Sequence, residues 1–366
     1  MLGAGSGGLA NAVELTQAGS RVHLWSRNPA TVAPYATGVV PYSGLLGDGE
    51  AILELVTADL DRALEGATAA VVSLPAFLHG QLFADLAHRG WDAPVVLSPG
   101  HTGGALHLRE VFQKSGGRCP PVAELSSLPY VCRAQPGEGV RVTGRARQLR
   151  CGSLPAHAEA AKLAGQLWSC ELDFCDVLAS SLSNVNLVLH PPVALLAAAW
   201  VEATKGGFRF YADAMTDGVG RVVDALDSER LEVAARLGHR LPPLAGEMQR
   251  LGTVDDGPCP DATKPGRPAG KSTVVTTADL VRTGQANLSI RAPSSLAHRY
   301  YKEDFAFGLA PLLALAAVAK ADLPVASSLL WLGRVLVGDE MPPDLGAEAL
   351  GIAGLSADDL VAMVRQ

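Results

Sequence analysis

Residues 183–192 place polar side chains in an otherwise apolar segment near the middle of the chain. Asn186 and His190 are four residues apart, so on a helix they project from one face. An imidazole that titrates near neutral pH can act as a general acid or base. Pro191 disfavours helical geometry at His190, so we expect the helix to end or kink there and a new one to begin with the proline pair. The alternative is a buried histidine bonded to a local carbonyl, which is the more frequent role of a lone histidine.

A second group of polar side chains lies in residues 297–311. Arg299 could bind a substrate carboxylate with two hydrogen bonds or pair with an internal acid. Asp304 directly precedes an apolar run of helical pattern, so by propensity alone we expect it to cap a helix. Glu124, expected beside a ligand crevice, could hold a substrate ammonium group or cap the next element. Each of these residues has a structural role as the alternative to a chemical one.

The chain opens with a glycine-rich segment that fits the G-x-G-x-x-G pattern of dinucleotide-binding folds. Gly3 permits a tight turn, Gly5 lets the backbone approach a pyrophosphate, and Gly8 allows close packing of the following helix. The amino terminus of that helix favours negative charge. A helical segment through Ala18, a stop at Gly19 and a strand-like segment at residues 21–25 follow, which is the context that the motif requires. The predicted cofactor cradle consists of Gly3, Gly5, Ser6, Gly7 and Gly8.

Only Met1 and Leu2 precede the first glycine, although a dinucleotide fold needs an apolar strand at this place. Loss of the middle strand would remove the support of the helices on both faces of a parallel sheet. We therefore expect the natural reading frame to start upstream of Met1.

The strand-like segment at residues 21–25 runs into Ser26 and Arg27. Proteins that prefer NAD usually carry an acid here, whereas a hydroxyl followed by a guanidinium suits a 2′-phosphate, so NADP(H) is favoured over NAD(H). Arg27 could equally be an ordinary surface arginine. Two later strand-like segments lead into residues that should line the nicotinamide side of the sheet edge, namely Pro75, Ala76, Gly100, His101 and Thr102.

Composition narrows the class of protein. With 366 residues, two domains are expected, and 48% apolar against 18% charged residues indicates a large buried interior. The net charge of −7 argues against a general nucleic-acid binder, which would need clustered basic side chains. The one basic run fits a solvated edge strand as well as an anion site. It consists of Arg141, Arg145, Arg147 and Arg150.

The six cysteines form no Cys-x-x-Cys pair and lack a histidine partner at zinc-finger spacing, so we predict no metal site. No signal peptide precedes the glycines, and the longest apolar runs are shorter than the ~20 residues that a membrane span needs. We therefore expect a cytoplasmic protein with free thiols that binds small molecules, as a monomer or a homodimer.

The second half of the sequence is helical in pattern, with a domain boundary expected near Ala179, between residues 1–179 and 180–366. Residues 193–203 are apolar nearly all round, which indicates a buried helix, and residues 228–237 predict an amphipathic one. Residues 252–270 are rich in Pro and Gly and predict an exposed loop, either a lid or a tolerated insertion. The expected fold is an α/β Rossmann-type dinucleotide-binding domain followed by an all-α domain.

Several of these segments, in consistent order along the chain, together resemble the NAD(P)-dependent octopine/nopaline (opine) dehydrogenase family. They are the Gly3, Gly5 and Gly8 motif, residues 123–130, residues 183–191, Phe210 and Tyr211, Glu229 and Arg230, and residues 299–309. The resemblance implies a dinucleotide-binding domain joined to an all-helical domain, and reductive joining of a 2-oxo acid to the amino group of an amino acid. It also implies that His190 matches the family's catalytic histidine and Asp304 the aspartate that pairs with it.

The predicted reaction is hydride transfer from NAD(P)H to the imine formed between the two substrates. His190 would supply the proton, Asp304 would fix its tautomer, and Arg299 would anchor a carboxylate. Asn186 would orient the substrate, although a structural hydrogen bond fits it at least as well. One alternative is a carbonyl reductase of the glycerol-3-phosphate or ketopantoate type, with Lys205 as its lysine. Another is a sensor that binds dinucleotide without catalysis.

Overall fold

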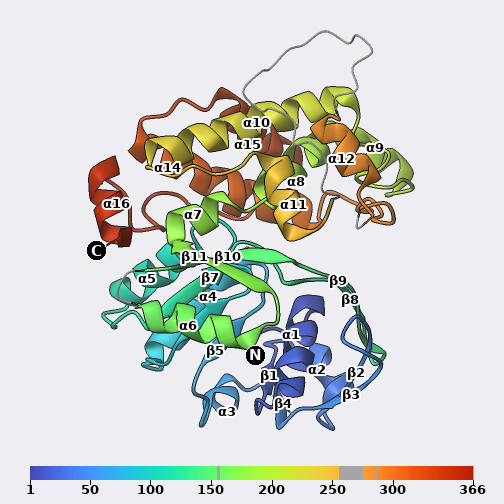
Figure 1. Cartoon of the computed structure of the whole chain (residues 1–366), viewed down its shortest axis with the longest axis vertical. Helices are drawn as coiled ribbons and strands as arrows, with labels where there is room; N and C mark the ends of the chain where they lie inside the picture. Colours follow the sequence, from blue (N-terminus) through green and yellow to red (C-terminus); the bar gives the residue numbers. More distant parts are fainter. Residues whose placement is uncertain (155–156, 255–274, 286, 366) are drawn as a thin grey trace. The chain divides into compact units, whose positions relative to one another are not determined.

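The computed structural model describes residues 1–154, 157–254, 275–285 and 287–365. These residues form two compact units (Figure 1). Unit 1 comprises Met1–Gly100 and Leu108–Val177, and unit 2 comprises His101–His107 and Leu178–Gln366. The segment His101–His107, which the sequence placed with the first domain, packs with the second unit instead.

The main sheet of unit 1 has the strand order β4-β1-β5-β6-β7-β10-β11, with the first two residues of the chain between β1 and β5. Its strands are β1 (His23–Trp25), β4 (Leu55–Thr57), β5 (Ala70–Val72), β6 (Val95–Leu97), β7 (Val122–Leu125), β10 (Gln148–Ser153) and β11 (Glu171–Asp176). Leu2 bridges Trp25 and Val72 in parallel, and its N–H donates to the carbonyl of Val71 at 2.7 Å. The pairing is parallel throughout except between β10 and β7.

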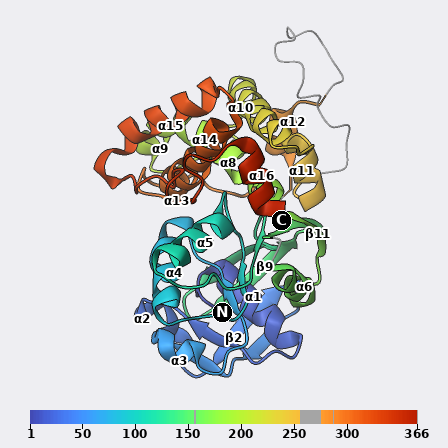
Figure 2. The ribbon, with the colours of Figure 1, turned by 90° about the vertical axis from the view of Figure 1, so that its left-hand side faces the viewer.

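Helices cover both faces of this sheet, and Figure 2 shows α4 to one side and α6 to the other. The helices of unit 1 are α1 (Ser6–Gln17), α2 (Pro29–Val32), α3 (Leu60–Leu64), α4 (His79–His88) and α6 (Ala158–Leu167), while α5 (Gly104–Lys114) begins in unit 2; η1 (Ala33–Tyr35) and η2 (Ala76–Leu78) are 3-10 turns. Helix α1 buries Leu9, Ala10 and Val13 and ends before Gly19, whose φ of 88° stops it as predicted.

A second sheet in unit 1 has the order β3-β2-β9-β8. Its strands are β2 (Val39–Gly44), β3 (Gly49–Ile52), β8 (Tyr130–Gln135) and β9 (Gly139–Arg145). Arg141 and Arg145 of the basic run lie on β9, and Arg150 lies on β10. Each of these strands pairs on both sides, so the edge-strand alternative is wrong. Arg145 pairs with Glu14 at 3.2 Å and Arg150 with Asp173 at 3.0 Å. These guanidiniums therefore neutralise acids of the same unit.

Unit 2 is helical in the part of the chain that the structure describes. Its helices are α7 (Val177–Leu182), α8 (Asn186–Leu196), α9 (Ala198–Thr204), α10 (Asp217–Arg236), α11 (Leu244–Leu251), α12 (Thr277–Thr283), α13 (Arg299–Asp304), α14 (Ala310–Ala319), α15 (Pro324–Val337) and α16 (Ala357–Arg365), with a π-helical turn η4 (Phe305–Leu309) and a 3-10 turn η5 (Gly338–Glu340). An α/β unit and a helical unit confirm the predicted fold class.

Three helix predictions need correction. Helix α8 continues through Pro191 and Pro192 instead of ending at His190, because its fully buried surroundings outweigh the lost backbone donors. The single helix predicted over residues 193–203 is two, since α8 and α9 meet at Ala197 with a bend of 62°. Helix α10 starts eleven residues earlier than predicted, at Asp217, where the Thr216 hydroxyl accepts from the Val219 N–H.

The predicted loop at residues 252–270 falls mostly, from residue 255 on, outside the described residues, as does Cys259. Among the described helices none is by itself long and apolar enough to cross a membrane, while the bent pair Val177–Leu196 and Ala198–Thr204 meets those two criteria together.

Candidate active site

The glycine motif forms the turn between Leu2 and helix α1 in unit 1. Gly3 has φ +120°, and a Cβ there would lie 2.3 Å from the carbonyl oxygen of Ser73. A Cβ on Gly8 would lie 1.9 Å from the carbonyl oxygen of Gly3, so both positions exclude side chains. A Cβ on Gly5 would meet nothing within 4 Å. There is therefore open space beside Gly5, whereas Gly3 and Gly8 are closely packed against the backbone.

The amino terminus of α1 is free to face a ligand. Gly5 is its N-cap and, within the described chain, no side chain caps the helix there. Gly5 is exposed, and Ser6 and Gly7 are half-buried, with the Ser6 hydroxyl accepting from the Ala134 N–H at 3.0 Å. A helix amino terminus with open space beside a glycine fits a pyrophosphate. The five predicted cradle residues thus form one surface that could hold a dinucleotide.

Ser26 and Arg27 lie at the carboxyl end of β1 and line a pocket of about 220 Å³ in unit 1. Its other lining residues are Trp25, Asn28, Thr31, Leu74, Leu78, Gln81, Leu82 and Asp85. Apolar walls with polar groups at the rim suit an adenosine moiety. The Asp85 carboxylate accepts a hydrogen bond from Gln81 at 3.2 Å. The pocket therefore offers a guanidinium and a hydroxyl from the predicted pair.

Pro75, Gly100 and Glu124 follow or lie within neighbouring strands of unit 1. Pro75 begins the turn η2 after β5, and the Gly100 N–H donates to the Leu125 carbonyl at 2.9 Å. Glu124 lies within β7 and is 1% exposed. A Cβ on Gly100 would lie only 2.5 Å from the Cβ of Glu124. Glu124 is therefore not a helix cap, and its carboxyl is enclosed by the loop that contains Gly100.

The imidazole of His190 and the carboxylate of Asp304 form a hydrogen bond in unit 2. His190 Nδ1 lies 2.7 Å from Asp304 Oδ2, and both residues are buried. Helices α8 and α13, which carry them, pack together. Asp304 is the last residue of α13 and holds the N-cap position of the π-helical turn η4, but its side chain makes no capping hydrogen bond there. Burial alone would raise the pKa of Asp304, but the charge and hydrogen bond of His190, with the charge of Arg299, hold it below its usual range.

The second nitrogen of the imidazole faces a tyrosine. His190 Nε2 lies 2.7 Å from the hydroxyl of Tyr211, which is buried as well. The ring of Tyr300 lies 4.2 Å from the imidazole between centroids, and Phe210 lies 6.3 Å away at a steep angle. The sequence associated Tyr211 with a family but gave it no role. The histidine is thus held between a carboxylate and a phenol within an aromatic surrounding.

Arg299 lies on the first turn of α13, and its guanidinium pairs with Glu303 at 2.6 Å. Glu303 also faces His101, with 3.4 Å between His101 Nε2 and Glu303 Oε1. His101 has a φ of 59° and is buried. The internal acid that the sequence offered as a partner of Arg299 is therefore present, and the neighbouring imidazole shares it.

Asn186 is the first residue of α8, one turn before His190, and is half-buried. Its N–H donates to the Asn184 side chain at 3.1 Å, and the Asn184 amide donates to the hydroxyl of Thr102 at 3.1 Å. Thr102 belongs to the segment that packs with unit 2. Asn184 therefore fixes the start of α8, while Asn186 stands on the turn that carries the imidazole.

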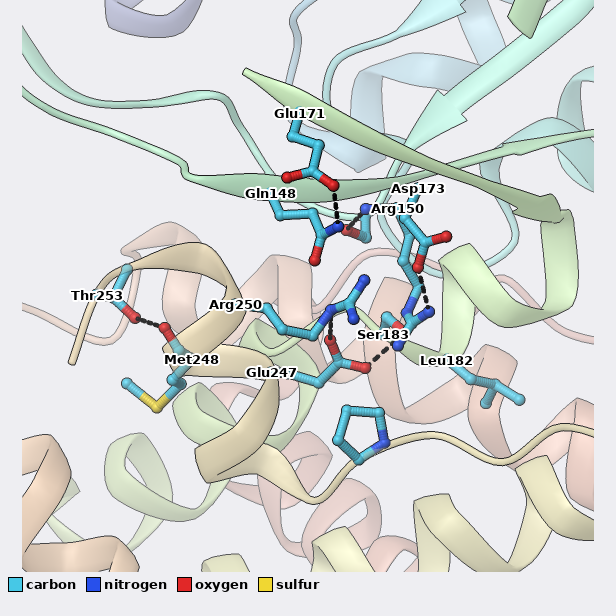
Figure 3. Close-up of polar contacts among 12 residues, drawn as sticks. Gln148, Arg150, Glu171, Asp173, Leu182, Ser183, Glu247, Met248, Arg250 and Thr253 are labelled. Atoms are coloured by element: carbon cyan, nitrogen blue, oxygen red, sulfur yellow. Dashed lines mark hydrogen bonds and ion pairs between the residues drawn. The ribbon is translucent and has the colours of Figure 1, made fainter. Parts of the chain in front are cut away.

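Other acids in each unit are engaged in structural contacts, as Figure 3 shows. In unit 2, the Ser183 hydroxyl donates to Glu247 of α11 at 2.9 Å, and Arg250 lies 3.9 Å from the same carboxylate. In unit 1, Gln148 of β10 donates to Glu171 of β11 at 2.7 Å, beside the pair of Arg150 with Asp173. Glu247 thus holds the turn before α8.

Comparison with known proteins finds similarity to one family of dehydrogenases. The family model described as "NAD/NADP octopine/nopaline dehydrogenase, alpha-helical domain" matches residues 174–337. An opine dehydrogenase of Arthrobacter sp. (strain 1C) is 28% identical over 363 residues, which are 98% of this chain and 96% of that protein. The second half of the chain thus matches the alpha-helical domain of the octopine/nopaline dehydrogenases, and nearly the whole chain is similar to an opine dehydrogenase.

Solved structures of this family share the fold. An octopine dehydrogenase with NADH and L-arginine superimposes with a TM-score of 0.72 at 17% identity, covering 98% of this chain and 96% of that one. A yersinopine dehydrogenase with NADP⁺ bound has a TM-score of 0.71 at 16% identity, covering 100% and 97%. A ketopantoate reductase from Ralstonia solanacearum has a lower TM-score of 0.59 at 16% identity, covering 92% and 96%. The chain therefore shares its overall fold with the opine dehydrogenases, whose family is described as NAD/NADP-dependent.

Proposed function

We propose that this opine dehydrogenase relative reductively joins a 2-oxo acid to the amino group of an amino acid. When bound, the nicotinamide cofactor supplies the hydride that the imine carbon accepts. The protein must then provide a proton for the nitrogen, a site for the carboxylates and a surface for the dinucleotide. Candidates for these three roles are the His190–Asp304 pair, the Arg299 guanidinium and the glycine turn before α1.

His190 is our proton donor. The carboxylate of Asp304 accepts from Nδ1, which leaves Nε2 as the nitrogen that exchanges a proton. In this assignment Arg299 binds a substrate carboxylate, because nearly half of its side chain is exposed while its partner Glu303 is buried. Asn186 orients the substrate from the same helix as His190. Glu124 is a substrate-binding candidate on unit 1.

For the cofactor we propose NADP(H) over NAD(H). Ser26 and Arg27 line the pocket at the end of β1, and Arg27 is exposed there, as recognition of a 2′-phosphate requires. Gly3, Gly5, Ser6, Gly7 and Gly8 would hold the pyrophosphate, with Pro75 and Gly100 nearer the nicotinamide. Replacing Arg27 with Ala should raise the KM for NADPH and leave that for NADH unchanged. Equal effects on both cofactors would contradict the assignment.

The observation that carries the proposal is the buried 2.7 Å contact between His190 and Asp304. Its test is a comparison of His190→Ala with Lys205→Ala in cofactor oxidation with a panel of 2-oxo acids and amino acids. Lys205 is the C-cap of α9 in the left-handed conformation, a place where a lysine complements the helix dipole. We expect loss of turnover only in the histidine variant. Near-normal turnover of His190→Ala would refute the proposal.

A further inference from the structure

Both ring nitrogens of His190 are engaged in unit 2. Nδ1 lies 2.7 Å from Asp304 Oδ2, and Nε2 lies 2.7 Å from the Tyr211 hydroxyl. All three residues are at most 5% exposed. Since the carboxylate occupies Nδ1, a proton that leaves the imidazole must leave from Nε2, and at that nitrogen it meets the phenol. The two contacts form a linear chain from Asp304 through His190 to Tyr211.

The phenol is held in place by backbone pairing. The Phe210 N–H donates to the Ile290 carbonyl at 2.8 Å, and the Ala292 N–H donates to the Phe208 carbonyl at 2.9 Å. The ring of Phe210 packs edge-on against Tyr211, with 5.0 Å between centroids. These two backbone hydrogen bonds and the ring contact hold Tyr211 in place. The position of its hydroxyl is therefore determined by the fold.

A phenol can both accept and donate a proton, as a relay requires. When the imidazole is neutral, the Tyr211 O–H donates to Nε2. When the imidazole is protonated, the Tyr211 oxygen accepts from Nε2–H, and the hydroxyl proton is directed away from His190. We propose that Tyr211 relays the proton between His190 and the substrate nitrogen. This inference rests on the proposed reaction and names the group that touches the acceptor nitrogen.

Hydride addition to the imine carbon converts the C=N π pair into a pair on nitrogen. That pair takes the Tyr211 proton and forms the N–H bond of the product amine, while the phenolate oxygen takes the Nε2 proton of His190. The imidazole ends neutral, with Nδ1–H still bonded to the Asp304 carboxylate, and regains its proton from water in the next cycle. Protons and electron pairs therefore balance over the whole step.

The competing explanation is that Tyr211 merely covers Nε2 when substrate is absent and moves aside for it. Under that explanation, removal of the hydroxyl would leave turnover unchanged or raise it, because the imidazole would be unblocked. Under the relay, removal would break the proton path. Tyr211→Phe therefore separates the two explanations, because only the relay predicts a lower turnover.

The matched control is Tyr301→Phe. Tyr301 is also buried, lies next to Tyr300 on α13, and donates its hydroxyl to the Ala194 carbonyl of α8 at 3.0 Å. Tyr301→Phe thus removes one buried phenol hydroxyl that contacts α8, the helix that carries His190, without affecting the hydrogen bonds of the His190 nitrogens. Thermal melting of both variants reports whether each folds.

The experiment is single-turnover cofactor oxidation in mixtures of H₂O and D₂O, with NADPH and the substrate pair that gives the highest rate. We expect Tyr211→Phe to lower the rate about 100-fold, within the range of general acid catalysis, and to change a curved dependence on deuterium fraction into a linear one. Tyr301→Phe should stay within about twofold of the parent and keep the curvature. A linear dependence in the parent enzyme, or an unchanged rate in Tyr211→Phe, overturns the relay. Loss of activity in His190→Ala together with either result would leave the proposed reaction intact.

Discussion

The guanidinium of Arg299 pairs with the carboxylate of Glu303 at 2.6 Å. The Glu303 side chain is 1% exposed, whereas the Arg299 side chain is 48% exposed. The two residues are four apart on α13, so the buried acid fixes the direction of a guanidinium that reaches the surface. Glu303 is itself held near His101 at 3.4 Å. A rigid, half-exposed guanidinium is pre-organised to accept a carboxylate.

We therefore predict that Glu303→Gln raises the KM for the 2-oxo acid about tenfold, equivalent to about 1.4 kcal/mol, with a smaller change in kcat. The reason is that the Arg299 side chain loses its fixed direction while the His190 pair is untouched. Lys302→Gln is the control, because Lys302 lies on the same helix as Glu303 and pairs with the exposed Glu340 of η5 at 2.7 Å. Steady-state kinetics decide the matter. Equal KM values for parent and Glu303→Gln would show that Glu303 does not position Arg299.

The glycine turn allows binding and stability to be separated. A methyl group on Gly5 meets nothing within 4 Å, so Gly5→Ala should melt close to the parent but bind NADPH at least about tenfold more weakly, because the methyl occupies the pyrophosphate's approach. Gly8→Ala should lower the melting temperature even without cofactor, since its Cβ would lie 1.9 Å from the Gly3 carbonyl oxygen. Fluorescence titration and thermal melting test both. Undiminished binding by Gly5→Ala would contradict the cradle.

Local patterns in the sequence predict much of this fold. The glycine spacing, the Gly19 stop and the alternation of apolar strands with helices follow from short-range preferences, so they are visible without coordinates. The spacing of Asn186 and His190 likewise places both on α8. The all-helical second half follows from the same periodicity.

Long-range packing accounts for what the sequence does not reveal. The Tyr211 hydroxyl reaches His190 because Phe208 and Phe210 pair with residues some eighty positions later. His101 belongs to unit 2 although Gly100 before it belongs to unit 1, and Pro191 lies inside a buried helix against its propensity. In each case tertiary contacts outweigh the local preference, and no pattern of nearby residues encodes them.

A buried acid on α10 should stabilise the start of α15. The Glu229 carboxylate accepts from the Val325 and Ala326 N–H groups at 2.7 and 2.8 Å. Burial raises the pKa of Glu229, while these two hydrogen bonds act in the opposite direction. We predict that Glu229→Ala lowers the free energy of unfolding by about 2 kcal/mol, because two helix-terminal donors lose their acceptor.

Glu232→Ala is the control on the same helix. Glu232 pairs with Arg236 at 2.7 Å, but both side chains are more than 40% exposed, so its loss should cost less than about 1 kcal/mol. Urea denaturation of the two variants beside the parent provides the measurement. Equal midpoints for both variants would mean that the acceptor role of Glu229 contributes nothing beyond a surface charge.

The His190–Asp304 pair should also make stability depend on pH. Because the pKa of Asp304 in the folded protein lies below its ordinary value of 3.8, the unfolded chain binds more protons than the folded one between these two values. The contribution of Asp304 to stability is therefore complete above the unfolded pKa and is lost as pH falls through the folded one. Asp304→Asn lacks this contribution, so its unfolding free energy should fall less steeply than that of the parent between about pH 5 and pH 3. Urea denaturation of both proteins across that range measures the difference, and curves that stay parallel would show that His190 does not hold the Asp304 carboxylate ionised.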